Sequence, residues 1–420
     1  MLTTEASDSL RKKLGILFVK LTWTCIVGSL GWAICSSCRL AVADQYYSAD
    51  TPTSVAAAIR LEPGNADYHA LLAEHQEGNG VNPSRELLEA VALSPLTSSY
   101  LVRAALRSEV DRDFPAAEKF LIKAAQVDRK FAPRWALLSF YFRRGSETRD
   151  WPAGFWPTLY RALAMSSPAD SDAVFQLAWE RSEDPDEILG RIPPESNIRR
   201  QYLNFLIGTQ RLMPAGTVAK NLAARATEED TAILLRYCER ASAKDTASAV
   251  SVWNSLVGRR LISGGILNPS AGRILTNKAF AISSNPVGFD WRIPSVEGVL
   301  VSQSDEGNGI KVNFTGDEPE DCAIIKELVP VVPGRQFEIA YKYSSAGAVV
   351  RGLRWEVAGK DGIVATSPEL SSENDSAQGS VAFVADASTA QLILRYQRPL
   401  GTARAEATVI IRELADRILK

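Results

Sequence analysis

The sequence predicts a multidomain chain of three parts: an N-terminal membrane-spanning helix, an all-α solenoid of helix pairs, and a C-terminal all-β antiparallel sandwich. Three observations support this prediction. An apolar run stands near the N-terminus, apolar residues then recur at helical spacing, and the last third alternates apolar and polar residues with a period of two. The length of 420 residues leaves room for two or three domains.

Residues 14–34 are apolar apart from Lys20, and the polar residues 1–13 before them end in Arg11, Lys12 and Lys13. About 20 apolar residues cross one bilayer, and a basic cluster before the span favours a cytoplasmic N-terminus. We therefore predict a single-pass anchor at 14–34. The bulk of the chain would then be extracytoplasmic, which means periplasmic in a Gram-negative cell.

Two alternatives to an anchor stay open at this point. Ala41-Val42-Ala43 matches a signal-peptidase site, so the apolar run could belong to a long signal peptide that is cleaved after Ala43. The distance from Ile34 to Ala43, and Arg39 between them, favour an uncleaved anchor. The run could also be a buried helix of a soluble fold.

A repeat is clearest over Pro95–Phe142. Small and large apolar residues recur at helical spacing on both sides of a break at Asp111–Pro115. Trp135 stands 34 residues after Leu101 and opens a similar series: Leu101, Ala104, Ala105 and Ser108 are followed by Trp135, Leu138, Ser139 and Phe142. This segment resembles the tetratricopeptide-repeat family, whose period is about 34 residues of paired helices. Small residues let two helices approach closely while large neighbours fill the adjacent space.

The resemblance extends over 44–262. Repeats end near Pro63, Pro95 and Pro168, and three Ala-rich amphipathic helices follow Pro193-Pro194. Such a stack implies a concave face that binds a peptide or protein partner. The inserted aromatic residues Trp151, Phe155 and Trp156 are our candidates for lining that groove. Alternatively, they wedge an irregular helix pair apart.

Residues 263–274 are rich in Gly, Ser and Pro, which predicts a linker. From 275 to 416 the chain alternates apolar and polar residues between turns, as expected for an antiparallel sandwich of eight or nine strands. The apolar sets of three predicted strands are Ile310, Val312 and Phe314; Phe337, Ile339, Tyr341 and Tyr343; and Leu392, Leu394 and Tyr396. The same alternation directs Trp355 into the core.

Three stretches of this domain resemble jelly-roll carbohydrate-binding modules. They are Asn277–Phe280, Pro333–Phe337 and Thr408–Leu414. The resemblance implies a jelly-roll fold and a polysaccharide ligand. Ala281 stands where these modules usually carry an acidic residue after the opening Phe, so we do not expect their metal site.

Sugar binding requires exposed aromatic planes beside polar groups. The segment NPVGFDWRIP offers Phe289, Asp290, Trp291 and Arg292, and these four are our candidate carbohydrate-binding residues. The alternative is that Trp291 packs to seal one end of the sandwich.

Charge and motifs argue against several other functions. The net charge of −2 and pI near 6.0 do not favour nucleic-acid binding. The chain has two histidines, His69 and His75, both on predicted repeat helices, and it lacks a phosphate-binding loop and a Cys/His metal cluster. The five cysteines do not suggest a disulfide framework, and the acidic loop Asp317–Asp321 suggests a solvated loop more than a calcium site. We expect no catalytic residue, no cofactor and no metal.

The expected function is a non-enzymatic, membrane-anchored scaffold. Its helical arm would bind proteins and its sandwich would engage a polysaccharide, as in accessory proteins of bacterial envelope or exopolysaccharide assembly. The rival hypothesis is a pure protein–protein adaptor whose sandwich binds no sugar. An aromatic-lined sheet face would favour the first hypothesis, and a face of aliphatic, Lys and Glu side chains the second. The sequence leaves the ligands and the oligomeric state open.

Overall fold

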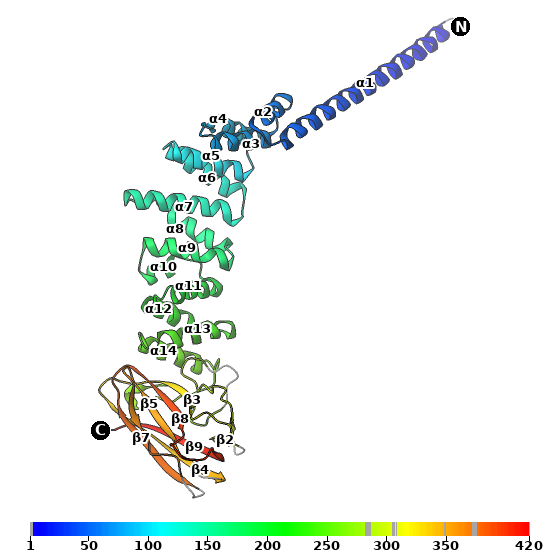
Figure 1. Cartoon of the computed structure of the whole chain (residues 1–420). Helices are drawn as coiled ribbons and strands as arrows, with labels where there is room; N and C mark the ends of the chain where they lie inside the picture. Colours follow the sequence, from blue (N-terminus) through cyan, green and yellow to red (C-terminus); the bar gives the residue numbers. More distant parts are fainter. Residues whose placement is uncertain are drawn as a thin grey trace. The chain divides into compact units, whose positions relative to one another are not determined.

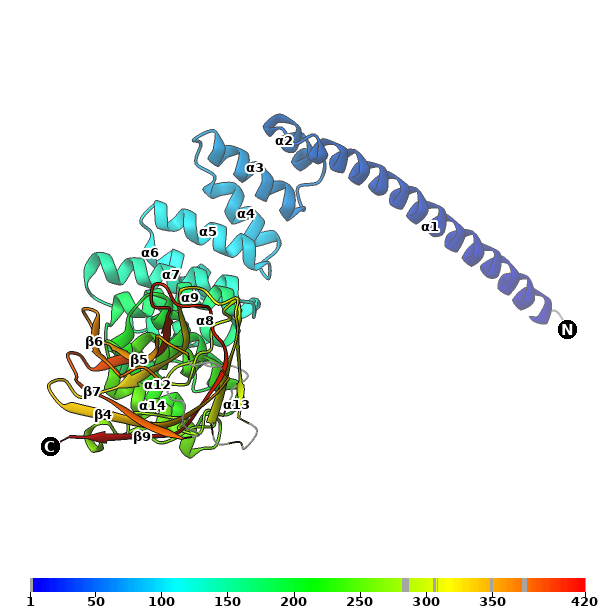
Figure 2. The ribbon, with the colours of Figure 1, turned by 60° about the horizontal axis from the view of Figure 1, so that its bottom comes forward.

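The computed structural model describes residues 3–281, 287–304, 307, 309–347, 350–371 and 376–419. The chain forms two compact units, Met1–Met165 and Ser166–Lys420. The first holds helices α1 to α8, and the second holds α9 to α14 followed by the β-sandwich (Figures 1 and 2). The predicted fold class, helices in pairs followed by an antiparallel sandwich, is confirmed.

The first unit begins with the long helix α1 (Thr3–Ser48). Within its segment Lys20–Ser48, an 18-residue stretch has a mean hydropathy of 1.5 and no residue buried against the rest of the chain. By length and composition this helix can cross a membrane, a criterion that N-terminal signal sequences also meet.

The end of α1 packs as part of the helical arm. Ala43 is completely buried against Ala58 and Tyr68, and Arg39 forms a 2.9 Å ion pair with Glu62. Helical packing therefore begins before residue 44, because the last turns of α1 serve as the first helix of the first pair.

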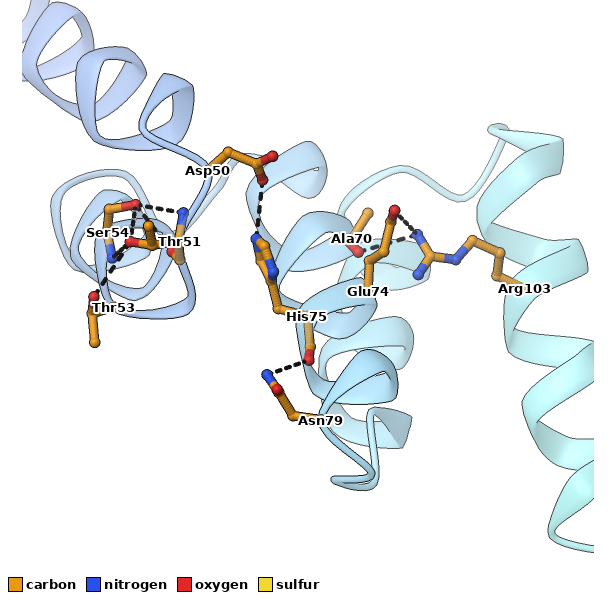
Figure 3. Close-up of polar contacts among 9 residues, drawn as sticks. All are labelled: Asp50, Thr51, Thr53, Ser54, Ala70, Glu74, His75, Asn79 and Arg103. Carbon is orange, nitrogen blue, oxygen red and sulfur yellow. Dashed lines mark hydrogen bonds and ion pairs between the residues drawn. The ribbon is translucent and has the colours of Figure 1, made fainter.

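Seven further helices complete the first unit. They are α2 (Pro52–Leu61), α3 (Ala66–Gly78), α4 (Ser84–Leu93), α5 (Ser98–Val110), α6 (Phe114–Val127), α7 (Phe131–Thr148) and α8 (Phe155–Met165). Their starts follow local sequence signals. At α2, Thr51 and Ser54 form a reciprocal capping box and Pro52 occupies the first turn (Figure 3). This arrangement provides hydrogen-bond acceptors for backbone N–H groups that have no carbonyl partner within the helix.

The repeat pattern predicts the buried side of these helices correctly. Each second helix carries fully buried alanines where it meets its partner, such as Ala58, Ala90 and Ala124. Of the residues that recur in the sequence, Leu101, Ala104, Ala105 and Leu138 are buried, whereas Ser108, Trp135, Ser139 and Phe142 are half-buried. Small residues at these positions let neighbouring helices pack closely.

Polar contacts link successive first helices at the repeat spacing. Arg103 Nη1 donates to the Ala70 carbonyl 33 residues earlier at 3.1 Å, a contact visible in Figure 3. Arg143 Nε donates to Glu109 34 residues earlier at 2.8 Å. In the second unit, Arg200 Nη1 donates to Asp230 30 residues later at 2.9 Å. Residues about one repeat apart in the sequence therefore contact one another in the folded protein.

The second unit continues with six helices and nine strands. The helices are α9 (Pro168–Arg181), α10 (Pro185–Arg191), α11 (Ser196–Gly208), α12 (Leu212–Ala223), α13 (Glu228–Ala241) and α14 (Thr246–Gly258). The strands are β1 (Val299–Gln303), β2 (Gly309–Thr315), β3 (Asp321–Pro330), β4 (Gln336–Gly347), β5 (Leu353–Ala358), β6 (Ile363–Thr366), β7 (Ala377–Val384), β8 (Thr389–Gln397) and β9 (Glu406–Ile418).

The strands form two antiparallel sheets packed face to face. One has the order β1-β2-β9-β4-β7 and the other β3-β8-β5-β6. All three predicted apolar sets, and Trp355, are buried between the sheets. The alternation did not reveal β1, β3 and β6. In β3 the adjacent Ile324 and Ile325 are both buried at a register shift against β8, which breaks the period of two.

The Gly- and Pro-rich segment 263–274, predicted to be a linker, packs against α14. Leu267 and Ile274 are buried, and the Asn254 side chain both donates to the Leu267 carbonyl and accepts from its N–H, each at 2.8 Å. Trp253 Nε1 donates to the Gly265 carbonyl at 3.2 Å. The backbone of this segment therefore bonds directly to α14.

Candidate functional site

A groove on the first unit is lined by three helices and the turn before α8. Its volume is about 360 Å³, and we call it the α6–α8 groove. Its lining residues are Ile122, Ala125 and Gln126 from α6; Arg134, Leu137 and Tyr141 from α7; and Gly154, Pro157, Thr158 and Arg161 from the turn and α8. A volume of this size suits a few side chains of a bound peptide or a small molecule.

The inserted residues shape one wall of this groove. A Cβ atom on Gly154 would lie 2.7 Å from the Tyr141 ring, so only glycine allows the turn to approach that ring. The Tyr141 hydroxyl donates to Glu118 at 2.8 Å. Burial, together with this carboxylate, raises the pKa of Tyr141 well above its usual range. Tyr141 therefore stays neutral and fixed at the groove wall.

Two arginines, Arg134 and Arg161, line the groove. Arg134 Nη1 donates to the carbonyls of Asp128 and Lys130 at 3.0 and 2.8 Å, so its guanidinium caps the C-terminal end of α6. Residues 114–165 contain nine Lys and Arg against four Asp and Glu, whereas the whole chain has a net charge of −2. The α6–α8 region is thus a basic part of an acidic protein.

The predicted groove residues Trp151, Phe155 and Trp156 lie beside this site but do not line it. Trp151 contacts the rings of Phe142 and Phe155, with ring centroids 5.6 and 5.1 Å away. It also covers Gly145, whose Cβ would lie 2.4 Å from the indole, and Phe155 is 1% exposed. Trp151 and Phe155 therefore pack between α7 and α8.

The predicted carbohydrate residues occupy the interior of the second unit. Phe289 is 0% and Trp291 4% exposed. Phe289 meets Trp253 of α14 edge-on, while Trp291 stacks on Phe280 and contacts Trp355. The expectation of exposed ring planes is therefore corrected, because both rings pack in the core.

The two polar members of this set also serve the structure. Asp290 accepts from the backbone N–H of Trp291 at 2.8 Å. Arg292 pairs with Glu239 of α13 at 2.8 Å. In the described geometry, neither residue stands beside an exposed aromatic plane.

The burial of aromatic residues is complete across the sandwich. Residues 275–419 contain ten of them, all within the described ranges, and none is more than 9% exposed. They are Phe280, Phe289, Trp291, Phe314, Phe337, Tyr341, Tyr343, Trp355, Phe383 and Tyr396. A sugar ring has no aromatic plane on which to stack in this arrangement.

The outer faces of the two sheets carry polar, charged and aliphatic side chains instead. On the five-stranded sheet, Asn313 of β2 accepts from Thr408 of β9 at 2.9 Å, and the aliphatic Leu300 is 63% exposed. On the four-stranded sheet, Arg395 pairs with Asp321 at 2.5 Å and with Glu356 at 3.4 Å. Hydrogen bonding to this arginine lowers the pKa of Asp321. No described aromatic ring of the sandwich is exposed on either face, which favours the adaptor hypothesis.

The carboxylates of the acidic loop Asp317–Asp321 have partners in the structure. Glu318, in the loop predicted to be solvated, is 2% exposed and accepts from Tyr396 and the Ala405 N–H at 3.1 and 2.9 Å. The part of the chain that the structure describes contains no group of three or more His, Cys, Asp or Glu side chains arranged to hold a metal ion.

Sequence reasoning missed the groove residues Ile122, Arg134 and Arg161. They lie on three helices, and no local motif connects them. The signal that could have found them is the excess of basic residues between 114 and 165. The net charge of the whole chain conceals this excess, because acidic residues elsewhere offset it.

No protein-family model and no curated protein matches this sequence. Solved structures resemble parts of it. PilF of Pseudomonas aeruginosa shares 14% identity over 55% of this chain and 93% of its own, with a TM-score of 0.22. The thermophilic tetratricopeptide-repeat protein TTC0263 of Thermus thermophilus shares 17% over 49% and 98%, with a TM-score of 0.24. A CBM4 structure shares 11% over 34% and 99%, with a TM-score of 0.27.

The architecture itself consists of paired helices followed by a two-sheet antiparallel sandwich.

Proposed function

We propose that this protein is a membrane-anchored, non-enzymatic adaptor that holds a partner protein on its helical arm. The observation that carries the proposal is the contrast between its two domains. The arm has an open groove with apolar and basic lining, whereas the sandwich encloses all ten of its aromatic rings. Open apolar surface beside charged groups is typical of protein-binding sites.

Membrane anchoring is supported by the apolar part of α1 and by the packing at its end. A signal peptidase needs an accessible, extended substrate, but Ala43 is fully buried inside a continuous helix. We therefore propose an uncleaved anchor with the arm outside the cytoplasm. In immunoblots of membrane fractions the protein should run at the mass of the full chain, and a product lacking residues 1–43 would overturn this part of the proposal.

The protein-binding role can be tested by photo-crosslinking in the native host. A photoreactive amino acid replaces Gln126 at the groove or, as the control, Gln378, an exposed residue on the sandwich strand β7. We expect a discrete crosslinked protein from position 126 and none from position 378. Crosslinking from 378 alone would assign partner binding to the sandwich, and no crosslink from either position would contradict the adaptor role.

Polysaccharide binding, with a role in envelope or exopolysaccharide assembly, is a second candidate function. The polar outer face of the five-stranded sheet, which includes Asn313 and Thr408, supports it, since hydroxyl groups can bind polar side chains without ring stacking. Affinity electrophoresis of the full chain, compared with Asn313→Ala and with Gln378→Ala as an exposed control, tests it. Retardation that only Asn313→Ala abolishes would support this second function, while unretarded migration in every polysaccharide would exclude it for those tested.

A further inference from the structure

We propose that the α6–α8 groove binds an extended acidic peptide segment of a partner protein. In this arrangement one apolar side chain of the peptide lies on the groove floor, and its carboxylates pair with Arg134 and Arg161. The proposal rests on the protein-binding function above and specifies the chemistry of the partner.

The floor of the groove is apolar and partly open. Ile122 is 38% exposed although it is a large aliphatic residue, and the neighbouring Leu137 is 7% exposed. The rings of Tyr141 and Pro157 complete this surface. Covering it with an apolar side chain removes hydrocarbon surface from water, which favours binding.

The charged groups at the groove are basic. Arg161 is exposed, and neither Arg161 nor Arg134 forms an ion pair with the carboxylates that the structure describes. Asp128 lies near Arg134 but accepts from Ser98 Oγ and the Lys130 N–H at 2.8 and 2.9 Å. No Asp or Glu is among the lining residues. Arg134 also donates through Nη2 to the Ala125 carbonyl at 3.3 Å, so its guanidinium is held in place beside the groove. A bound carboxylate can therefore pair with the exposed Arg161 and is attracted by the fixed charge of Arg134.

The other carboxylate close to the groove is already occupied. Glu118, one turn before Ile122 on α6, accepts from Tyr141 at 2.8 Å. Residues 114–165 contain nine basic and four acidic residues, and one of the basic residues, Arg143, pairs with Glu109 of α5. The two arginines at the groove attract an acidic chain and repel a basic one.

The lining favours a peptide over a free inorganic anion or a nucleic acid. An inorganic anion would leave the apolar floor exposed, and a nucleic acid would need a longer basic track than one groove in a chain of net charge −2. A peptide of mixed acidic and apolar side chains satisfies both the arginines and the floor.

The test uses the full chain in phosphatidylcholine nanodiscs and a fluorescein-labelled peptide of Gly, Ser and Glu with one central Leu. Fluorescence polarisation should show saturable binding that weakens as salt is raised. The same peptide with Lys in place of Glu should not bind. Arg161→Glu should weaken binding by about tenfold or more, since attraction becomes repulsion, and Ile122→Ser should weaken it with little change in salt dependence.

Arg85→Glu on α4 is the matched control, because Arg85 is also an exposed helix arginine, with 88% of its side chain accessible. Each variant should unfold at the temperature of the unaltered protein. Equal peptide affinity in Arg161→Glu and Arg85→Glu would overturn the proposal, as would equal binding of the Lys peptide.

Two further outcomes separate this inference from the proposed function. A partner crosslinked at position 126 through a non-acidic segment would leave the adaptor role intact and overturn the acidic-peptide proposal. Residues 35–113 contain eleven acidic against six basic residues. The acidic segment of a second copy could therefore occupy the groove. Sedimentation would then show self-association that weakens with salt and is lost in Arg161→Glu. That result would overturn the proposal that the groove binds a different protein.

Discussion

Glu327 is a carboxyl group enclosed in the sandwich, 1% exposed. It accepts from the backbone N–H and the hydroxyl of Thr276 at 3.1 and 3.0 Å. Burial is the largest influence and raises the pKa of Glu327 well above its usual range, and the charges of Asp290 and Asp416 raise it further. The two hydrogen bonds from Thr276 oppose this rise without cancelling it. Glu327 therefore links Thr276, at the start of the domain, to β3. Keeping its carboxylate charged in the interior costs folding free energy, and this cost grows as pH rises.

The raised pKa predicts how stability varies with pH. Above the unfolded-state value of 4.5, the folded protein binds this proton more tightly than the unfolded chain does. The contribution of Glu327 to stability is thus fully present below pH 4.5 and is lost as pH rises toward the folded-state pKa. Glu327→Gln keeps an oxygen acceptor for Thr276, so we expect a higher melting temperature at pH 7.5 and a smaller change between pH 4.5 and 7.5.

Melting temperatures of both proteins across this pH range test the prediction. Thr276→Val is the companion variant, because it removes the hydroxyl donor while Glu327 remains. An unchanged pH profile in Glu327→Gln would mean that the buried carboxyl is not the titrating group.

At the scale of elements, the contacts between successive first helices extend the stabilisation of each helix pair to its neighbours. Arg200 of α11 and Asp230 of α13 illustrate this. The Asp230 side chain has no exposed surface, and its second oxygen accepts from the Thr227 N–H and hydroxyl at the start of α13. One carboxylate thus caps a helix and joins two repeats.

We expect Arg200→Met to destabilise the protein by about 1–3 kcal/mol, the cost of leaving a buried acceptor without its partner. Arg417→Met is the control, since Arg417 pairs with Glu338 but is 68% exposed, and an exposed pair contributes about 0–1 kcal/mol. Urea unfolding followed by circular dichroism measures both. Equal losses in the two variants would contradict the distinction between buried and exposed pairs.

At the scale of the whole molecule, the sandwich and the last helix pair behave as one packed body within the second unit. Trp253 of α14, 2% exposed, contacts Phe289 and bonds to Gly265. Thr246 Oγ1 donates to Ser388 Oγ at 2.8 Å, and Arg292 pairs with Glu239. These contacts lead us to expect that the sandwich protects the end of the helical arm from solvent, as a terminal cap does in repeat proteins.

Trp253→Ala should therefore destabilise α13, α14 and the sandwich together, by about 3–5 kcal/mol. Hydrogen exchange read by mass spectrometry resolves the two regions. Tyr160→Ala on α8 is the control, because Tyr160 is 41% exposed and should cost far less. Faster exchange confined to α13 and α14, with the sandwich unchanged, would show that the two parts unfold independently.

The local patterns of the sequence predicted most elements of this fold. Helix pairs, their alanine contacts, six of the nine strands and the inward side of the strands follow from periodicity and turn residues, because these depend on residues near one another in the chain. The strand β3 was missed because a register shift buries adjacent residues, and such a shift depends on the partner strand.

The binding surfaces required the tertiary structure. The motif at Phe289–Arg292 suggested exposed aromatic rings, yet contacts with Phe280 and with Trp253, 36 residues before Phe289 in the sequence, bury them. The α6–α8 groove likewise combines residues from three helices that share no motif. The sequence by itself determined which residue types face inward on each element, since that is a local property. Which surfaces stay open was decided only by contacts between distant segments, since exposure depends on what packs against each side chain.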